Sequence, residues 1–393
     1  MKVIVDYIFI INLFNPDYNC SYRMRETMLA ALDDGTGKYI LNDLPMPAMP
    51  EGYALMRVHQ TGICGSDLHL TTDRSQKNES QTLPGGHEIA GEIIDMPTES
   101  NILKVGDRVA IEGIGAGKAC FSCDYCNYGQ WRHCEYKDEE TGGGFAEFIT
   151  RKPAGLFKIP DHMDWTDAAL VEPLAVSVHG FRYAGMKPDD VVGVVGSATI
   201  GLSSIVVAKE FGAREIIASA RYPQQAEAAK KMGADVVTGS DPGEFEEACR
   251  EANSGKGADF VVESIGGYQT ESFNQAVSAT RSQGTMLYLG GVKVPSGFDM
   301  FDPLLREIKI ISSNCYGVID GRHDFDVAIG ILASISCPFR DIVTHTFALN
   351  DIQKGISSFS KRITFNCFGE LILNSSPAIL YIDVRIEVNV FVI

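Results

Sequence analysis

The sequence has no apolar run long enough to span a bilayer, no internal repeat and no low-complexity segment. Its first residues, MKVIVDYIFIINLF, are largely apolar. Asp6 interrupts them and no small-x-small cleavage site follows, so we do not expect a secretory signal. A second plausible start at Met24 makes residues 1–23 either a true N-terminal extension or the product of a misplaced initiation codon. These absences argue against a membrane or secreted protein.

Basic residues are also scarce, with 34 Lys and Arg against 51 Asp and Glu and a net charge of −17. An acidic surface of this kind repels nucleic acid and anionic lipid. A zinc module that binds nucleic acid is therefore disfavoured, because the chain lacks the basic stripe that such a module needs. We expect no nucleic-acid or membrane partner.

Cysteine is too sparse for a disulfide scaffold, at ten residues in 393. Four cysteines lie close together, between Cys120 and Cys134. The scattered ones suggest a reducing compartment, hence the cytoplasm, whereas the cluster suggests a metal. The scattered cysteines are Cys20, Cys64, Cys249, Cys315, Cys337 and Cys367.

The length predicts two domains. From about residue 48 to residue 150, short apolar runs broken by glycine and proline predict a β-rich domain. From about residue 188, strands alternate with helices, as in a parallel sheet covered by helices on both faces. The end of the chain, ILYIDVRIEVNVFVI, alternates apolar and polar residues as a half-buried strand does, and such a strand needs a pairing partner.

The cysteine cluster has the spacing Cys120-x2-Cys123-x2-Cys126-x7-Cys134. A bacterial iron–sulfur run ends with a gap of three and then proline, which this one does not. Two-residue gaps strain a disulfide but suit tetrahedral ligation of zinc. Four thiolates leave no position for a substrate, so the cluster predicts a structural zinc.

Three other segments offer ligands: GICGSDLHL with Cys64, GGHEIAGE with His87 and Glu88, and VEPLAVSVHG with Glu172 at the start of an apparent helix. Each alone is weak, since a lone cysteine is usually a small buried hydrophobe. With the cysteine cluster and the nucleotide fold in this order, however, the chain resembles the zinc-dependent medium-chain dehydrogenase/reductase superfamily of alcohol, sorbitol and threonine dehydrogenases. The resemblance runs from about Met24 to Leu373.

The resemblance implies an α/β protein with a GroES-like β-rich catalytic domain and a Rossmann domain with a doubly wound parallel sheet. The parts it implies are a catalytic domain in two segments, residues 24–176 (which carry the structural zinc) and 313–373, a Rossmann domain at residues 177–312, and a C-terminal tail at residues 374–393.

It also implies a second, catalytic zinc bound by Cys64 and His87, with either Glu88 or Glu172 as the carboxylate ligand. Classical alcohol dehydrogenases have cysteine at the position of Glu172, and glutamate there resembles the polyol and threonine dehydrogenase branches. Three protein ligands leave one position for a substrate oxygen. In the family pattern Ser66 and His69 relay the alcohol proton to solvent; alternatively, Ser66 and its neighbour only form a turn.

The segment GSATIG, from Gly196 through Ile200 to Gly201, lies where a dinucleotide fingerprint belongs, with Ala198 in place of the usual middle glycine. An NAD-binding chain should have an acid about twenty residues further on. Here Ala220 is followed by Arg221, which favours NADP over NAD, with Ser219 as a further donor. By resemblance, Gly290 and Val292 in LGGV lie at the nicotinamide.

The predicted function is a zinc-dependent oxidoreductase that transfers a hydride between an alcohol or polyol and NAD(P), with two zinc ions per chain. The alternative is a non-catalytic relative that retains only the structural zinc; Ala198 and the unusual termini favour it slightly, whereas the intact ligand and relay residues oppose it. We expect a homo-oligomer, dimer or tetramer. The sequence leaves the substrate among the alcohols, polyols and hydroxy amino acids open.

Overall fold

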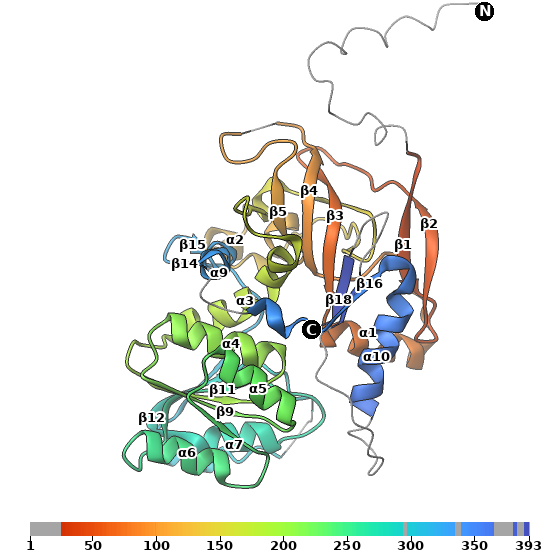
Figure 1. The fold of residues 1–393 in the computed structure, drawn as a ribbon. Coiled ribbons are helices and arrows are strands. Elements are labelled where there is room, and N and C mark those ends of the chain that lie inside the picture. The colour runs from red at the N-terminus through yellow and green to blue at the C-terminus, as the bar shows by residue number, and fades with distance from the viewer. Residues whose placement is uncertain are drawn as a thin grey trace, which may run out of the picture.

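The computed structural model describes residues 25–98, 100–293, 297–334, 339–364, 380–382 and 389–392. The predicted N-terminal extension, residues 1–23, lies outside them. The chain forms a β-rich domain and a second domain with a parallel sheet, and helix α3 lies between them (Figure 1).

The β-rich domain is built on an eight-stranded sheet in the order β16-β17-β18-β3-β4-β5-β7, with β6 also paired to β3, and on the antiparallel ribbon β1–β2. Its strands are β1 (Thr27–Asp33), β2 (Tyr39–Pro45), β3 (Ala54–Ile63), β4 (Glu88–Asp95), β5 (Arg108–Glu112), β6 (Phe148–Arg151), β7 (Leu156–Lys158), β16 (His345–Ala348), β17 (Leu380–Ile382) and β18 (Asn389–Val392). Its helices are α1 (Gly65–Lys77), α2 (Asp124–Asn127), α9 (Asp324–Ala333) and α10 (Ile352–Thr364), and a short hairpin joins β14 (Val318–Ile319) to β15 (Arg322–His323).

The pairing of β3 with β4 brings together two of the predicted ligands of the catalytic zinc, Cys64 and His87. The strands are antiparallel, and Gly62 near the end of β3 is paired with Glu88 at the start of β4. Cys64 follows β3 directly and His87 precedes β4 directly, so residues 23 positions apart in the sequence meet at one end of the sheet. Alternate residues of β3, such as Met56 and Val58, are buried in the domain core, which fixes the register.

The second domain contains six parallel strands in the order β10-β9-β8-β11-β12-β13. This confirms the predicted doubly wound sheet. Its elements are β8 (Val191–Val195), α4 (Thr199–Glu210), β9 (Glu215–Ser219), α5 (Pro223–Met232), β10 (Val236–Thr238), α6 (Glu244–Ala252), β11 (Ala258–Glu263), α7 (Glu271–Ala279), β12 (Thr280–Tyr288), α8 (Phe301–Leu305) and β13 (Lys309–Ser312). The carboxyl ends of parallel strands share one edge, so the loops that follow them form one binding edge.

Helix α3 (Trp165–Ala184) packs against β3, β4 and β5 on one side and against α4 and β12 on the other. The prediction that Glu172 begins a helix is wrong. Asp164 caps the helix, and Glu172 lies in its middle, directly before Pro173. Proline inside a helix costs about 3 kcal/mol or more. Here both domains cover the helix, and residues 168–175 are all buried, so packing offsets that loss.

The predicted strand at the end of the chain is represented by two short ones within the described residues. Strand β18 pairs in parallel with Gln60–Ile63 of β3 and antiparallel with β16 and β17. The end of the chain therefore supplies a neighbour for the strand that leads to Cys64. Within the described residues, no helix is both long and apolar enough to cross a membrane.

Candidate active site and zinc sites

Three predicted ligands of the catalytic zinc converge. The ligand atoms of Cys64, His87 and Glu88 all lie within 4.8 Å of one another. The β3–β4 register brings the first two together, and Glu88 is the next residue of β4. Glu88 is buried, and its Oε2 atom has no hydrogen-bond partner. Thiolate, imidazole and carboxylate are the donor types that zinc binds in open, catalytic sites.

Glu172 lies close to this group but outside the set of atoms within 4.8 Å. It is buried on α3, its charge acts on both His87 and Glu88, and the phenol of buried Tyr316 lies beside it. The structure thus places Glu88 among the converging ligands and Glu172 next to them.

The electrostatics of this group fit a cation. Burial raises the pKa of Glu88 well above its usual range, and the charges of Cys64 and Glu172 raise it further. Burial also raises the pKa of Glu172. Several anionic groups held together out of water are unfavourable unless a positive charge accompanies them. A divalent ion held by Cys64, His87 and Glu88 would meet that requirement, and it would give the unpartnered Oε2 atom of Glu88 a partner.

Asp67 is a site residue that the sequence interpretation missed, since it was considered only as part of a turn. One of its carboxylate oxygens accepts a hydrogen bond from the Cys64 N–H at 2.9 Å, and the other lies 3.8 Å from Nδ1 of His87. Asp67 is buried, so both contacts are shielded from water. A carboxylate that orients both ligand segments is a positioning residue. Its position three residues after the capping cysteine is the sequence signal for this contact.

The predicted relay residues lie in the first turns of α1. Ser66 is exposed and His69 half-buried, and residues three apart lie on the same face of a helix. Burial lowers the pKa of His69, and the nearby ammonium of Lys293 lowers it further. The imidazole is therefore neutral at pH 7 and able to accept a proton.

The second group of potential metal ligands is the four-cysteine cluster for which the sequence predicts a structural zinc. The thiol sulfurs of Cys120, Cys123, Cys126 and Cys134 lie within 4.8 Å of one another. The Cys120 sulfur accepts hydrogen bonds from the hydroxyl and N–H of Ser122 and from the Cys123 N–H, each at 3.4 Å. These contacts, the hydroxyl first, lower the pKa of Cys120 to about 5. Burial, by contrast, raises the pKa of Cys126 to about 12. Four cysteine sulfurs in this arrangement fit a closed tetrahedral zinc site.

Residues 115–140, which we call the zinc lobe, contact the β14–β15 hairpin at two points. The Trp131 ring stacks on His323 with centroids 5.3 Å apart, and its indole N–H donates to the Cys126 carbonyl at 3.2 Å. The Gly129 carbonyl accepts from the Val318 N–H at 3.0 Å. The second contact joins the lobe to the segment that carries Tyr316 beside Glu172.

The nucleotide fingerprint occupies the turn between β8 and α4. Gly196 has a φ of +96°, and a Cβ atom there would lie 2.5 Å from Ile265. A Cβ on Gly201 would lie 2.0 Å from the Gly196 carbonyl oxygen, so this glycine allows helix and strand to pack closely. Ala198, the departure from the usual pattern, has a φ of −90°, which any residue adopts. The carbonyl of Ile200, inside α4, accepts from the hydroxyls of Ser203 and Ser204.

Arg221 is exposed directly beyond the carboxyl end of β9, with its guanidinium 5.6 Å from the centre of the Tyr222 ring. Ser219 ends that strand, and its hydroxyl accepts from the Gly196 N–H at 3.0 Å. That hydroxyl retains its own proton for donation. Both residues therefore lie where the start of the fingerprint turn meets the carboxyl end of β9.

The loops after β11 and β12 form the remaining part of this edge. A Cβ on Gly290 would lie 2.4 Å from the Gly266 nitrogen, and the Val292 N–H donates to the Tyr288 hydroxyl. Buried Glu263 accepts from the N–H groups of Ile265 and Gly266 at 2.9 and 2.8 Å and from that of Gly290 at 3.2 Å. The sequence interpretation missed Glu263, because only the fold shows that one carboxylate organises two loops.

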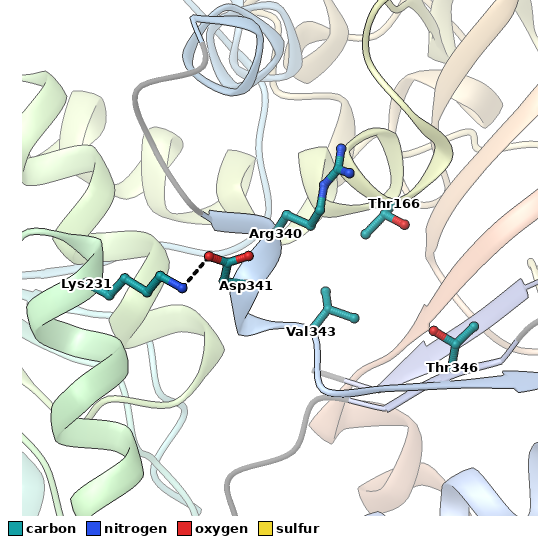
Figure 2. Close-up of a pocket in the computed structure, with 6 residues that line it drawn as sticks. All are labelled: Thr166, Lys231, Arg340, Asp341, Val343 and Thr346. Atoms are coloured by element: carbon teal, nitrogen blue, oxygen red, sulfur yellow. Dashed lines mark ion pairs between the residues drawn. The ribbon is translucent and has the colours of Figure 1, made fainter.

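A separate pocket is lined by Thr166, Lys231, Arg340, Asp341, Val343 and Thr346 (Figure 2). Its charges are already paired within the protein: Lys231 with Asp341, and Arg340 with Asp164 and Asp167. None of the predicted site residues lines it, so we assign it no part in the chemistry.

Comparison with known proteins agrees with this geometry. Residues 50–161 match the alcohol dehydrogenase GroES-like domain, and residues 199–334 match the zinc-binding dehydrogenase domain. Sorbitol dehydrogenase of Bacillus subtilis is 29% identical over 339 residues, which cover 85% of this chain and 94% of that protein. Probable D-xylulose reductase A of Arthroderma otae is 30% identical over 332 residues, 82% of this chain and 91% of its own.

Among solved structures, galactitol-1-phosphate dehydrogenase of Escherichia coli superposes with a TM-score of 0.76 at 21% identity, covering 93% of this chain and all of that one. The chain therefore belongs to the zinc-dependent medium-chain dehydrogenase/reductase family, as its motifs predicted. It is a zinc-type alcohol or polyol oxidoreductase that uses a nicotinamide cofactor and a small-molecule substrate, and the alternative of a non-catalytic relative is disfavoured.

Proposed function

We propose that the chain is a polyol dehydrogenase whose reaction takes place at Cys64, His87 and Glu88, with Glu172 beside them, and which prefers NADP. The convergence of those three ligand atoms within 4.8 Å carries this proposal. The two relatives named above support the substrate class, because both are named for a polyol or its keto sugar. We further propose one catalytic and one structural zinc per chain.

The residues of the site divide the work between binding and proton transfer. When bound at Cys64, His87 and Glu88, zinc supplies a Lewis acid that favours loss of the alcohol proton. Asp67 holds His87 and the Cys64 backbone in place. Ser66 takes the proton from the substrate side, and His69 passes it to solvent. Glu263 fixes the glycine loops that face the nicotinamide end of the cofactor.

The pH dependence tests the relay. We expect His69→Ala to slow alcohol oxidation by about 10²-fold at low pH and less at high pH, where hydroxide can accept the proton directly. Lys293→Met is the companion variant. Because Lys293 lowers the pKa of His69, its removal should raise that pKa and move the acid limb of the profile to higher pH. Profiles of kcat/KM that coincide for all three proteins would remove His69 from the mechanism.

The cofactor preference depends on Arg221. The acidic residue that NAD-binding chains have at the end of this strand is missing after β9, and the Arg221 guanidinium is present instead. This combination suits a 2′-phosphate. We expect Arg221→Ala to raise KM for NADP about tenfold or more, with KM for NAD changed little, since a hydrogen bond to a charged group contributes about 1.5–3 kcal/mol. A wild-type KM that is lower for NAD than for NADP would contradict the preference.

We also propose a homo-oligomer. Strand β13 is the edge of its sheet, and helix α8 beside it exposes Phe301, Leu304 and Leu305, each by 67–70%. An apolar patch next to an open sheet edge favours self-association. The seven described cysteines are all free thiols, which supports a reducing compartment such as the cytoplasm.

The experiment that tests the function is a panel of alcohols and polyols, assayed with NADP and NAD before and after removal and return of zinc. We expect polyols to be oxidised only by the zinc-loaded protein. Turnover that is unchanged by complete removal of zinc would contradict the proposal.

A further inference from the structure

Two basic side chains of the zinc lobe stand out because no carboxylate pairs with them. Other basic residues in and near the lobe are paired: Lys118 with Glu140, and Lys152 with Asp138. Within the described part of the chain, Arg132 and Lys137 have no carboxylate oxygen within 4.0 Å.

These two cations are held next to each other. The Lys137 ammonium donates to the carbonyl of Arg132, and the Nε of Arg132 is buried without an acceptor. Burial, and then the Arg132 charge, lower the pKa of Lys137. Two like charges close together, one with an unused buried donor, are stabilised by an anion placed between them.

The pair lies beside the active site. The lobe is bonded to the segment that follows Cys315 through the Gly129–Val318 hydrogen bond. The Arg132 guanidinium lies within hydrogen-bonding reach of the Cys315 thiol, which also senses the charges of Glu172 and His87. Cys315 itself has a φ of +62°, a left-handed conformation that is unfavourable for this residue type.

The charge of Arg132 does not serve to neutralise Glu172. The charges that act on Glu172 come from His87 and Asp67. The catalytic group itself is rich in carboxylates, so an anionic part of a substrate would be repelled there. Arg132 and Lys137 offer a place where such a group would be attracted instead.

We propose that Arg132 and Lys137 bind an anionic group, a phosphate monoester or a carboxylate, on a polyol whose hydroxyl carbon is oxidised at Cys64, His87 and Glu88. This rests on the proposed function and narrows its substrate class to anionic polyols. A planar guanidinium binds phosphate or carboxylate through two parallel hydrogen bonds, and the ammonium adds a second charge.

The test compares a neutral polyol with its monophosphate and with the sugar acid of the same chain length, using the zinc-loaded full-length protein. Two readouts are needed: kcat/KM and binding by titration calorimetry. We expect the wild type to prefer one of the anionic compounds. Arg132→Met and Lys137→Met should each lower the ratio of anionic to neutral kcat/KM by about ten- to hundredfold, which corresponds to about 1.5–3 kcal/mol per charged hydrogen bond. The two anionic arms distinguish phosphate from carboxylate.

Lys256→Met is the matched control. It removes an exposed lysine just before the amino end of β11, whereas the cofactor edge lies at the carboxyl ends of the strands. It should leave the ratio unchanged. Arg132→Lys keeps the positive charge but removes the paired donors of the guanidinium. The number of zinc ions bound per chain by each variant shows whether the lobe remains intact. Equal binding of neutral and anionic compounds by the wild type, or a ratio unaffected in both methionine variants, would overturn the inference. The proposed function fails separately, if no member of the set is oxidised; calorimetry still tests anion binding in that case.

Discussion

Replacing Cys64 by serine is expected to lower kcat/KM for polyol oxidation by at least about 10³-fold and to reduce the zinc content from two ions per chain to one. A metal ion at such a site contributes several kcal/mol to the reaction, and each 1.36 kcal/mol is tenfold in rate. Cys64 provides the only sulfur among the three converging ligand atoms. Zinc by mass spectrometry and steady-state kinetics are measured on the same preparation.

Cys249→Ala provides the control for this prediction. Cys249 is buried in the domain with the parallel sheet, and it belongs to neither group of candidate metal ligands. This variant should retain both zinc ions. A Cys64→Ser protein with two zinc ions and full activity would refute the assignment.

The same two measurements decide which carboxylate completes the site. Glu88→Gln and Glu172→Gln have nearly the same shape as the wild type, and each removes one buried carboxylate. Because the Glu88 oxygen converges with Cys64 and His87, we expect Glu88→Gln to weaken zinc binding more than Glu172→Gln. The reverse order would make Glu172 the third ligand.

The second large effect is expected in the zinc lobe. Cys123→Ser should remove the structural zinc and lower Tm by roughly 10 °C or more, since the metal supplies much of the folding free energy of such a site and 1 kcal/mol shifts Tm by about 2–4 °C in domains of 150–250 residues. The loosened lobe should become sensitive to trypsin at Arg132 and Lys137. Activity should also fall, because the Gly129–Val318 contact connects the lobe to the segment beside Glu172.

Ser122→Ala is the matched change within the lobe. It removes one hydroxyl that bonds to the Cys120 sulfur and leaves all four sulfurs in place. We expect it to keep both zinc ions and a Tm close to that of the wild type. If the Cys123→Ser protein had the same Tm and the same resistance to trypsin as the wild type, the four-cysteine cluster would have no structural role.

Sequence spacing was sufficient to predict the cysteine cluster and the parallel sheet because both depend on short-range patterns. The βα units that begin at Val191 and Glu215 were recognisable from apolar runs followed by helical ones. The position of Glu172 was misjudged for a physical reason. Proline normally marks a helix start or break, and only packing from two domains allows α3 to continue through Pro173.

By itself, the sequence determined the class of fold, and it predicted a closed four-thiolate site and the residue types of an open one. The tertiary structure alone decided that Asp67 supports His87, that Glu263 holds two glycine loops, and that Arg132 of the lobe lies beside Cys315. The reason is that ligand spacing within one segment is encoded locally, whereas contacts between segments depend on strand register and on the packing of one domain against the other.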